Sequence, residues 1–398
     1  MISVINIKGD KSITHRIIML SSIISNDIII KNPSNCIDVL STIDALNLCG
    51  ANIIINNNEI TNNSKVHKNP NSILDCGNSG TTARLLIGLL FGMGISATID
   101  GDSSLRSRPM DRVLDPLESM NLKYKSLNKK LPVHLHSSKF NPANSYTLNV
   151  PSAQVKSSIL FASFNNPVKI IDKFGTRDHT ERMFKFFKNN KEHRIEYFVP
   201  GDISNAAFII CAGIFIKDSN FLIKNVLFNE SRNGFINVLK KMNADIFFKN
   251  VTEIQNEKVC DILVRYNPNL IPYQVSDNII VKMIDEIPIL AVVYCFVNFK
   301  TSLSNLSELR IKESDRISEI CSHLNRGNVD IIEKNESLYI NPDKKLYNTI
   351  NITSKDHRII MACEVFNLII SKKISQKQHS EVDISFPDFY KIISNLVK

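Results

Sequence analysis

The sequence predicts an α/β protein of two similar domains, because one pattern of apolar and polar segments recurs along its 398 residues. An apolar helical segment begins six times just after a polar turn. A strand, a second helix and two further strands follow most of these starts, at a spacing of roughly 60–70 residues. One such unit cannot bury its own helices, whereas three packed together can form one core. Six units therefore predict two domains of three units each, divided near Pro200-Gly201.

The six predicted helix starts carry residues that cap helices or approach ligands. They lie at Lys11-Ser12, residues 78–81, residues 152–154, residues 201–204, Asp285-Glu286 and residues 356–358. Ser, Asp and Asn cap helix N-termini, where free backbone N–H groups and the positive dipole end attract anions. Polar turns at residues 56–58 and 334–336 predict the hairpins that end two of the units. If all the helices point the same way, the two domains face each other across a cleft lined with positive helix ends.

The composition favours a soluble protein that binds a small polyanion. The formal net charge is +9, and the arginines stand in short motifs far apart in the sequence rather than in one basic stretch. This distribution favours a compact polyanionic ligand over a nucleic-acid duplex. No secretion signal precedes the first strand, and the apolar runs at residues 85–99 and 287–299 are too short or interrupted to cross a bilayer. We therefore expect a cytoplasmic protein that does not interact with membranes.

The eight cysteines are scattered and form no C-x-x-C motif. Buried free thiols in a reducing compartment explain this pattern better than disulfides or a metal cluster. His134 and His136 share one face of a predicted strand, but no nearby Cys or His completes a ligand set. We expect no metal site.

The first helix start combines Lys11, Ser12 and Arg16. Arg16 lies one turn beyond Ser12, so both side chains can reach one anion at the helix N-terminus. A second glycine-bearing start, at residues 75–84, places Gly80 and Arg84 in the same way. Each motif alone also fits an ordinary helix cap.

Four further stretches concentrate charge. A polar loop at residues 100–110 carries Arg106 and Arg108 ahead of Pro109, which favours bidentate anion binding, and residues 172–183 form another polar loop that enters a helix. Asp285 and Glu286 open an apolar helix, so they either stabilise its dipole or supply a general base. Residues 308–316 form the most charged stretch, in which a solvated helix face is the ordinary explanation. A glutamate among those cations needs substrate charge or desolvation to act as an acid.

Taken together and in order, these motifs resemble the EPSP synthase family of 3-phosphoshikimate 1-carboxyvinyltransferases. The match spans nearly the whole chain, from Gly9 to Ser385-Phe386-Pro387. The resemblance implies two domains of three βαβαββ units, an inside-out α/β barrel arrangement, closing on a cleft. Residues 12–200 would form the first domain, and residues 1–11 with 201–398 the second. The implied reaction transfers the enolpyruvyl group of phosphoenolpyruvate to the 5-hydroxyl of shikimate 3-phosphate, with no cofactor and no metal.

The resemblance also assigns residues to roles. Shikimate 3-phosphate would be held by Lys11, Ser12, Arg16, Ser152, Ala153, Gln154, Thr176, Arg177, Asp285 and Lys312. Phosphoenolpyruvate would be held by Lys11, Gly80, Arg108, Gln154, Arg316 and Arg358. Asp285 maps to the base on the attacking hydroxyl and Glu313 to the acid that protonates the methylene carbon, with Lys11 assisting. Ile384 departs from the family pattern, because many members have lysine there.

Two other functions fit the sequence less well. The sister enzymes that transfer enolpyruvyl to UDP-N-acetylglucosamine normally carry a cysteine in the loop that matches residues 103–108, and this sequence has none there. A basic nucleic-acid-binding protein on a similar repeat fold would bind oligonucleotides with a steep salt dependence. We expect a monomer with small-molecule substrates and no nucleic-acid partner.

Overall fold

The computed structural model describes residues 2–24, 27–142, 144–342 and 346–396, and it divides into two compact units. The N-terminal unit comprises Lys8–Val199 with Ile254–Glu257, and the C-terminal unit comprises Met1–Ile7, Pro200–Glu253 and Lys258–Lys398. The units differ from the predicted domains at the first crossing, because residues 8–11 group with the N-terminal unit. Gly9 accounts for this, since its Cα lies so close to Asn32 and Val199 that an added Cβ would be 2.1 Å from the Asn32 carbonyl oxygen.

Within the described residues, the helices of the N-terminal unit are α1 (Lys11–Ser21), α2 (Ile37–Leu48), α3 (Gly80–Gly92), α4 (Ser103–Ser107), α5 (Asp111–Glu118), α6 (Ala153–Ala162) and α7 (His179–Asn189). Of these, α1, α3 and α6 begin at the three polar turns that the sequence predicts for this unit. Its strands are β2 (Asp27–Lys31), β3 (Ile53–Asn56), β4 (Glu59–Asn62), β5 (Leu74–Asp75), β6 (Ala97–Asp100), β7 (Lys123–Ser126), β8 (Val133–His136), β9 (Ser145–Thr147), β10 (Lys169–Ile171) and β11 (Arg194–Phe198).

The C-terminal unit repeats this order. Its helices are α8 (Ile203–Phe215), α9 (Gly234–Lys241), α10 (Asp277–Ile280), α11 (Ile287–Cys295), α12 (Arg316–Arg326), α13 (His357–Ser371) and α14 (Phe389–Ser394), with 3₁₀ segments η1 (Val281–Glu286), η2 (Ser307–Ile311) and η3 (Ser380–Ile384). Its strands are β1 (Ser3–Asn6), β12 (Asn220–Leu227), β13 (Ile246–Ile254), β14 (Glu257–Arg265), β15 (Thr301–Leu303), β16 (Asp330–Lys334) and β17 (Ser337–Asn341).

Three sheets share one topology, in which one parallel pair is followed by an antiparallel hairpin. Their strand orders are β1-β12-β14-β13, β11-β2-β4-β3 and β5-β6-β8-β7. The remaining sheets are reduced, to β15-β17-β16 and to the parallel pair β10-β9. The last repeat contributes only helices within the described residues. The predicted α/β class and repeat are therefore confirmed, with incomplete sheets in some of the repeats.

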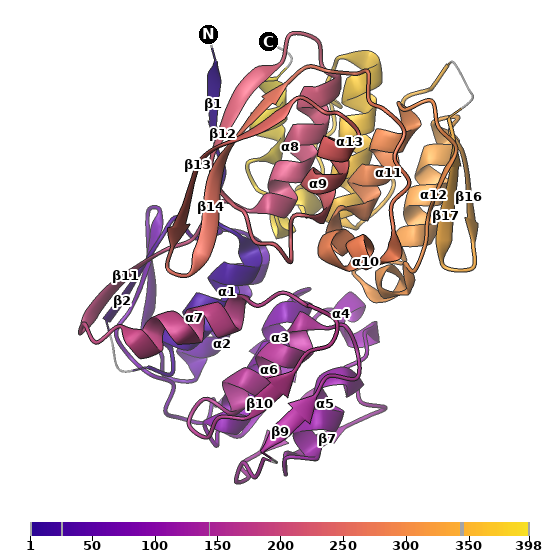
Figure 1. Cartoon of the computed structure of the whole chain (residues 1–398). Coiled ribbons are helices and arrows are strands. Elements are labelled where there is room, and N and C mark those ends of the chain that lie inside the picture. The colour runs from indigo at the N-terminus through magenta and orange to yellow at the C-terminus, as the bar shows by residue number, and fades with distance from the viewer. Residues whose placement is uncertain (1, 25–26, 143, 343–345, 397–398) are drawn as a thin grey trace. The chain divides into compact units, whose positions relative to one another are not determined.

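The helices that begin each repeat form the core of each unit. In the C-terminal unit, α8, α11 and α13 lie side by side and contact one another (Figure 1). Nearly all of their residues are buried. In the N-terminal unit, α3 packs closely against α6 and contacts α1. Each of the eight cysteines is a buried free thiol. None of the helices that the structure describes combines the length and apolar character needed to cross a membrane.

Gly88 sets the distance between α3 and α6. A Cβ at this position would lie 2.1 Å from the backbone oxygen of Ser158, so alanine fits only if the helices move apart. Overpacking of this kind costs about 1–3 kcal/mol, and we expect Gly88→Ala to lower the free energy of unfolding by that amount in urea titrations.

Gly94→Asn is the matched control for Gly88→Ala. Gly94 has φ +69°, which asparagine tolerates, and its nearest neighbour to an added Cβ is Ser137 Oγ at 3.9 Å. Equal losses of stability in the two variants would contradict the packing argument.

Candidate functional site

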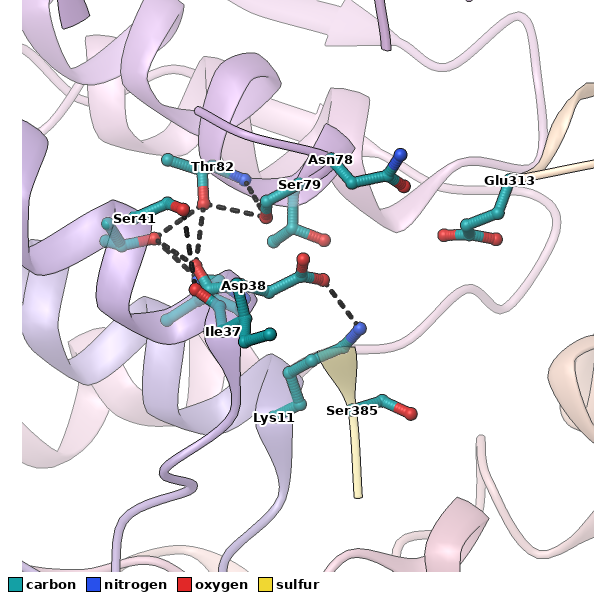
Figure 2. Close-up of polar contacts among 12 residues, drawn as sticks. Lys11, Ile37, Asp38, Ser41, Asn78, Ser79, Thr82, Glu313 and Ser385 are labelled. Carbon is teal, nitrogen blue, oxygen red and sulfur yellow. Dashed lines mark hydrogen bonds and ion pairs between the residues drawn. The ribbon is translucent and has the colours of Figure 1, made fainter. Parts of the chain in front are cut away.

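Lys11 opens α1 and is held by a carboxylate. Asp10 caps the helix by accepting a hydrogen bond from the Ile13 N–H at 2.9 Å. Lys11 Nζ lies 2.8 Å from Asp38 Oδ2, in the first turn of α2, and both side chains are largely buried (Figure 2). Sequence reasoning missed this partner of Lys11, because an acid in the first turn of a helix is an ordinary dipole stabiliser.

Arg16 joins three helices of the N-terminal unit. It is buried, and its Nε donates to Thr180 Oγ1 at 2.9 Å while Nη2 donates to Ser157 Oγ at 2.8 Å. Its Nη1 donates to the Ser12 carbonyl at 2.8 Å. Ser12 and Arg16 are thus adjacent at the start of α1, as the helical spacing predicts.

A second cluster surrounds the N-terminus of α3. A Cβ at Gly80 would lie 2.6 Å from Arg84 Nη1 and 3.5 Å from Arg108 Nη1, so both guanidinium groups lie beside this glycine. Arg84 Nη1 also donates to Gln154 Oε1 at 3.0 Å. The structure therefore brings Gly80, Arg108 and Gln154 into one group, joined through Arg84.

The two arginines ahead of Pro109 have different surroundings, which corrects their interpretation as one anion-binding pair. Residues 103–107 form the short helix α4 rather than a loop, and Arg106 Nε donates to Asp100 Oδ1 at 2.8 Å. That hydrogen bond from Arg106 holds the pKa of Asp100 below its ordinary value. Arg108 instead is buried and donates to Asn78 Oδ1 at 2.5 Å. Arg108 alone of this pair joins the cluster at Gly80.

The loop before α7 is anchored from α6. Ser152 caps α6, so Ala153 and Gln154 are its first residues. The buried Lys156 Nζ lies 3.0 Å from Asp172 Oδ2, which accepts a hydrogen bond from Thr176 Oγ1 at 2.7 Å. Burial opposes ionisation of Asp172, but the Thr176 and Lys156 hydrogen bonds outweigh it and lower the pKa of this carboxyl. Thr176 is thereby fixed near the start of α6, and Arg177, which follows it, is half-buried.

Arg316 is the centre of the charged cluster in the C-terminal unit. Its side chain is only 2% exposed, Nε lies 2.8 Å from Asp356 Oδ2, and Nη2 donates to Glu313 Oε2. Nη1 lies 3.4 Å from Asp285 Oδ1. Burial alone would lower the pKa of this guanidinium, but the carboxylates of Asp356, Glu313 and Asp285 outweigh burial and raise it. One cation therefore contacts three carboxylates.

The structure distinguishes the two adjacent acids at the start of α11. Asp285 has a side chain 16% exposed and lies 3.4 Å from Lys312 Nζ. Glu286 is buried and accepts a hydrogen bond from Ser204. Only Asp285 can therefore meet a ligand without rearrangement.

The stretch at residues 308–316 is not one continuous helix, which corrects its interpretation as a solvated helix face. The 3₁₀ segment η2 ends at Ile311, Lys312 is extended, and α12 begins at Arg316. Lys312 and Glu313 therefore lie in a connection, and this connection brings them to Asp285 and Arg316.

Arg358 is the second residue of α13, two positions after the capping residue Asp356. Its backbone N–H donates to Asp356 Oδ1 at 2.8 Å, and its guanidinium lies over the Phe208 ring at 5.8 Å from the centroid. Among the residues that the structure describes, the buried Arg358 Nη1 has no hydrogen-bond acceptor. A buried guanidinium donor without a protein acceptor is well placed for an anionic ligand.

The predicted residues thus form clusters in each unit. In the N-terminal unit, Arg16 contacts Ser12, and Gly80 lies beside Arg108 and, through Arg84, near Gln154. Ser152 caps α6 and Thr176 is held by Lys156 of the same helix, whereas Lys11 pairs with Asp38. Asp285, Lys312, Glu313, Arg316 and Arg358 are tied together through Arg316 and Asp356 within the C-terminal unit. In the described part of the chain, no three His, Cys, Asp or Glu side chains are grouped so that they could hold a metal ion.

Comparison with known proteins gives one consistent result. The family model for EPSP synthase (3-phosphoshikimate 1-carboxyvinyltransferase) matches residues 2–393. The chain is 36% identical to the 3-phosphoshikimate 1-carboxyvinyltransferase of Persephonella marina, over 99% of this chain and 96% of the relative. It is 39% identical to the enzyme of the same name from Caldicellulosiruptor saccharolyticus, over 97% of this chain and 95% of the relative.

Solved structures agree with the sequence comparison. The EPSP synthase of Acinetobacter baumannii superimposes with a TM-score of 0.85 at 29% identity, covering 99% of this chain and 95% of that one. The enolpyruvyl transferase NikO of Streptomyces tendae has a TM-score of 0.74 at 12% identity, covering 99% and 94%, and shows a likeness of fold alone.

Proposed function

The chain belongs to the EPSP synthase family, and from this premise we propose how its residues perform the reaction that its relatives are named for. The enzyme transfers the enolpyruvyl group of phosphoenolpyruvate to the 5-hydroxyl of shikimate 3-phosphate. The products are 5-enolpyruvylshikimate 3-phosphate and phosphate. Both substrates are polyanions, so the site has to supply several cations.

The N-terminal unit binds most of shikimate 3-phosphate in this proposal. The assigned residues are Lys11, Ser12, Arg16, Ser152, Ala153, Gln154, Thr176 and Arg177, and the C-terminal unit adds Asp285 and Lys312. The hydrogen bonds that link Arg16 to α6 and α7 support this assignment, because they join the motifs of three separate repeats. The attraction between two opposite charges in contact is roughly 4 kcal/mol at an effective dielectric constant of 20, so a few such cations are enough to bind a polyanionic substrate.

Phosphoenolpyruvate binds to Lys11, Gly80, Arg108, Gln154, Arg316 and Arg358 in this proposal. Gly80 matters because it leaves room beside the guanidinium groups of Arg84 and Arg108. The buried Arg358 donor supports the assignment in the C-terminal unit. Ile384, which stands where many relatives have lysine, cannot contribute a cation.

Asp285 and Glu313 divide the proton transfers. Asp285 takes the proton of the 5-hydroxyl while the hydroxyl oxygen attacks C2 of phosphoenolpyruvate. Glu313 protonates the C3 methylene carbon, and Lys11 assists this proton transfer. The resulting tetrahedral ketal phosphate then loses phosphate and a C3 proton, which restores the enol ether. The observation that best supports these roles is that Asp285 and Glu313 contact the same guanidinium, that of Arg316. One buried cation thus orients both acid–base groups.

Phosphate release distinguishes this function from its closest alternative. We expect the purified protein to release phosphate from phosphoenolpyruvate when shikimate 3-phosphate is present, and not when UDP-N-acetylglucosamine replaces it. Phosphate release from phosphoenolpyruvate with UDP-N-acetylglucosamine, but not with shikimate 3-phosphate, would overturn the proposal. Light scattering of the same sample tests the further proposal that the enzyme is a monomer.

Arg108→Ala tests the phosphoenolpyruvate assignment. The variant removes a charge-assisted hydrogen bond to the ligand, which is worth about 1.5–3 kcal/mol, so KM for phosphoenolpyruvate should rise about ten- to hundredfold. KM for shikimate 3-phosphate should change little in the same steady-state measurement.

Arg106→Ala provides the matched control for Arg108→Ala. Arg106 lies two positions earlier, but its guanidinium pairs with Asp100, so its loss should leave both KM values close to those of the wild type. Equal effects of the two substitutions would contradict the role of Arg108.

A further inference from the structure

A buried polar network begins at the residue next to Asp285. The Glu286 carboxylate accepts a hydrogen bond from Ser204 Oγ, and Arg232 Nη2 donates to the same hydroxyl at 2.8 Å. Arg232 Nη2 also lies 4.0 Å from Asp202 Oδ1. All four residues are at most 3% exposed. Arg232 therefore lies between two buried carboxylates, one of them reached through the serine.

This network joins three segments of the C-terminal unit. Asp202 caps α8 by accepting from the Ser204 N–H at 2.8 Å, so Ser204 is fixed at the start of that helix. Arg232 lies in the connection that leads into α9, and Glu286 ends η1 and precedes α11. The starts of two core helices and the turn before α9 thus share one set of hydrogen bonds.

The conformation of η1, the segment that carries Asp285, depends on contacts with neighbouring segments. Helical geometry in η1 is interrupted at Met283, which has φ −147° and ψ 27°. Gly234, at the start of α9, lies so close to Met283 that an added Cβ would be 2.9 Å from the Met283 Cβ. The start of α9, just after the turn that bears Arg232, therefore packs directly against η1. The hydrogen bond between Glu286 and Ser204 links the end of η1 to α8.

We propose that Arg232, Ser204 and Glu286 are positioning residues that hold the Asp285 carboxylate beside Lys312 and Arg316. The inference rests on the proposed function, in which Asp285 is the base. Proton transfer needs the two heavy atoms within about 2.6–3.2 Å, and a displacement of about 1 Å can cost 10²-fold in rate. Buried charges can often be replaced by apolar groups without loss of stability, so their presence next to a reacting group favours a role in geometry.

The test measures kcat and both KM values for Glu286→Gln and Arg232→Gln, each alone and combined with Asp285→Asn. We expect each single variant to lower kcat about 10- to 100-fold with little change in KM, because substrate-binding residues stay in place. In the Asp285→Asn background, the same substitutions should cause no further loss, because the residue on which they act no longer functions. Arg232→Lys, which keeps the charge, should recover part of the activity.

Glu364→Gln controls for the general effect of removing a buried carboxylate. Glu364 is 1% exposed in α13 of the same unit and accepts hydrogen bonds from Ser375 at 2.7 Å and Tyr390 at 3.1 Å. We expect this variant to lower the urea midpoint without lowering kcat by more than about twofold. An equal kcat loss in Glu364→Gln, or losses that multiply in the Asp285→Asn background, would overturn the positioning role. A wild-type protein that releases no phosphate would instead reject the proposed function on which the role depends.

Discussion

Glu313→Gln is expected to lower kcat by about 10²–10⁴-fold, which is the usual contribution of a positioned acid or base. Glutamine has nearly the same shape as glutamate and can still meet the Arg316 guanidinium through its carbonyl oxygen. It cannot deliver a proton to the C3 carbon of phosphoenolpyruvate. The loss should therefore appear in kcat, while both KM values change little in steady-state measurements.

Glu319→Gln gives the comparison for Glu313→Gln. Glu319 lies in the first turn of α12, where its side chain is 32% exposed and its Oε2 lies 3.8 Å from His323 Nδ1. It has no role in the proposed chemistry, so kcat should stay within about twofold of the wild-type value. If Glu313→Gln keeps wild-type kcat, another residue must protonate the substrate.

Arg316→Gln should have the largest effect on stability. The guanidinium is almost wholly buried and faces Asp285, Glu313 and Asp356, and Asp356 is fully buried. Removing one partner from a buried ion pair costs about 3–5 kcal/mol, because the remaining charges stay buried without compensation. Urea unfolding should show this loss, and the variant should also be inactive at all accessible substrate concentrations.

Arg310→Gln is the control for Arg316→Gln, because it removes an arginine that pairs with carboxylates but is partly exposed. Arg310 also pairs with two carboxylates, Asp315 and Glu333, but its side chain is 30% exposed. Water screens this pair, so the expected loss is about 1 kcal/mol or less. If Arg310→Gln lowers the free energy of unfolding as much as Arg316→Gln does, burial does not determine how much these ion pairs stabilise the fold.

The helix starts could be predicted from the sequence because their signals are local. Asp10, Ser79, Ser152, Asp202 and Asp356 each accept hydrogen bonds from the first turn of the helix that they precede. The capping residue, the polar turn before it and the apolar helix after it all lie within a few positions. The order of elements within a repeat follows from the same short patterns.

The partners of the charged residues could not be predicted, because they depend on the folded chain. Asp38 meets Lys11 across 27 positions, and Asp356 meets Arg316 across 40. Nothing in the spacing of these residues indicates the pairing. The network at Arg232 and Glu286 was missed for the same reason, since a single buried arginine has no periodic pattern. The short helix α4 was missed because its five residues are too few to show apolar periodicity.

The pairing of β1 with β12 bears on how the chain is assembled during synthesis. Ser3–Asn6 lies parallel to Phe221–Lys224, although the two segments are more than two hundred positions apart. Because β12 follows Lys8–Val199 in the sequence, β1 can pair with it only after that whole segment has been synthesised. A fragment that starts at Pro200 would expose β12 as an open sheet edge, which invites association with other chains. Supplying the missing strand, for instance by joining the first seven residues to such a fragment through a flexible linker, should restore a soluble C-terminal unit.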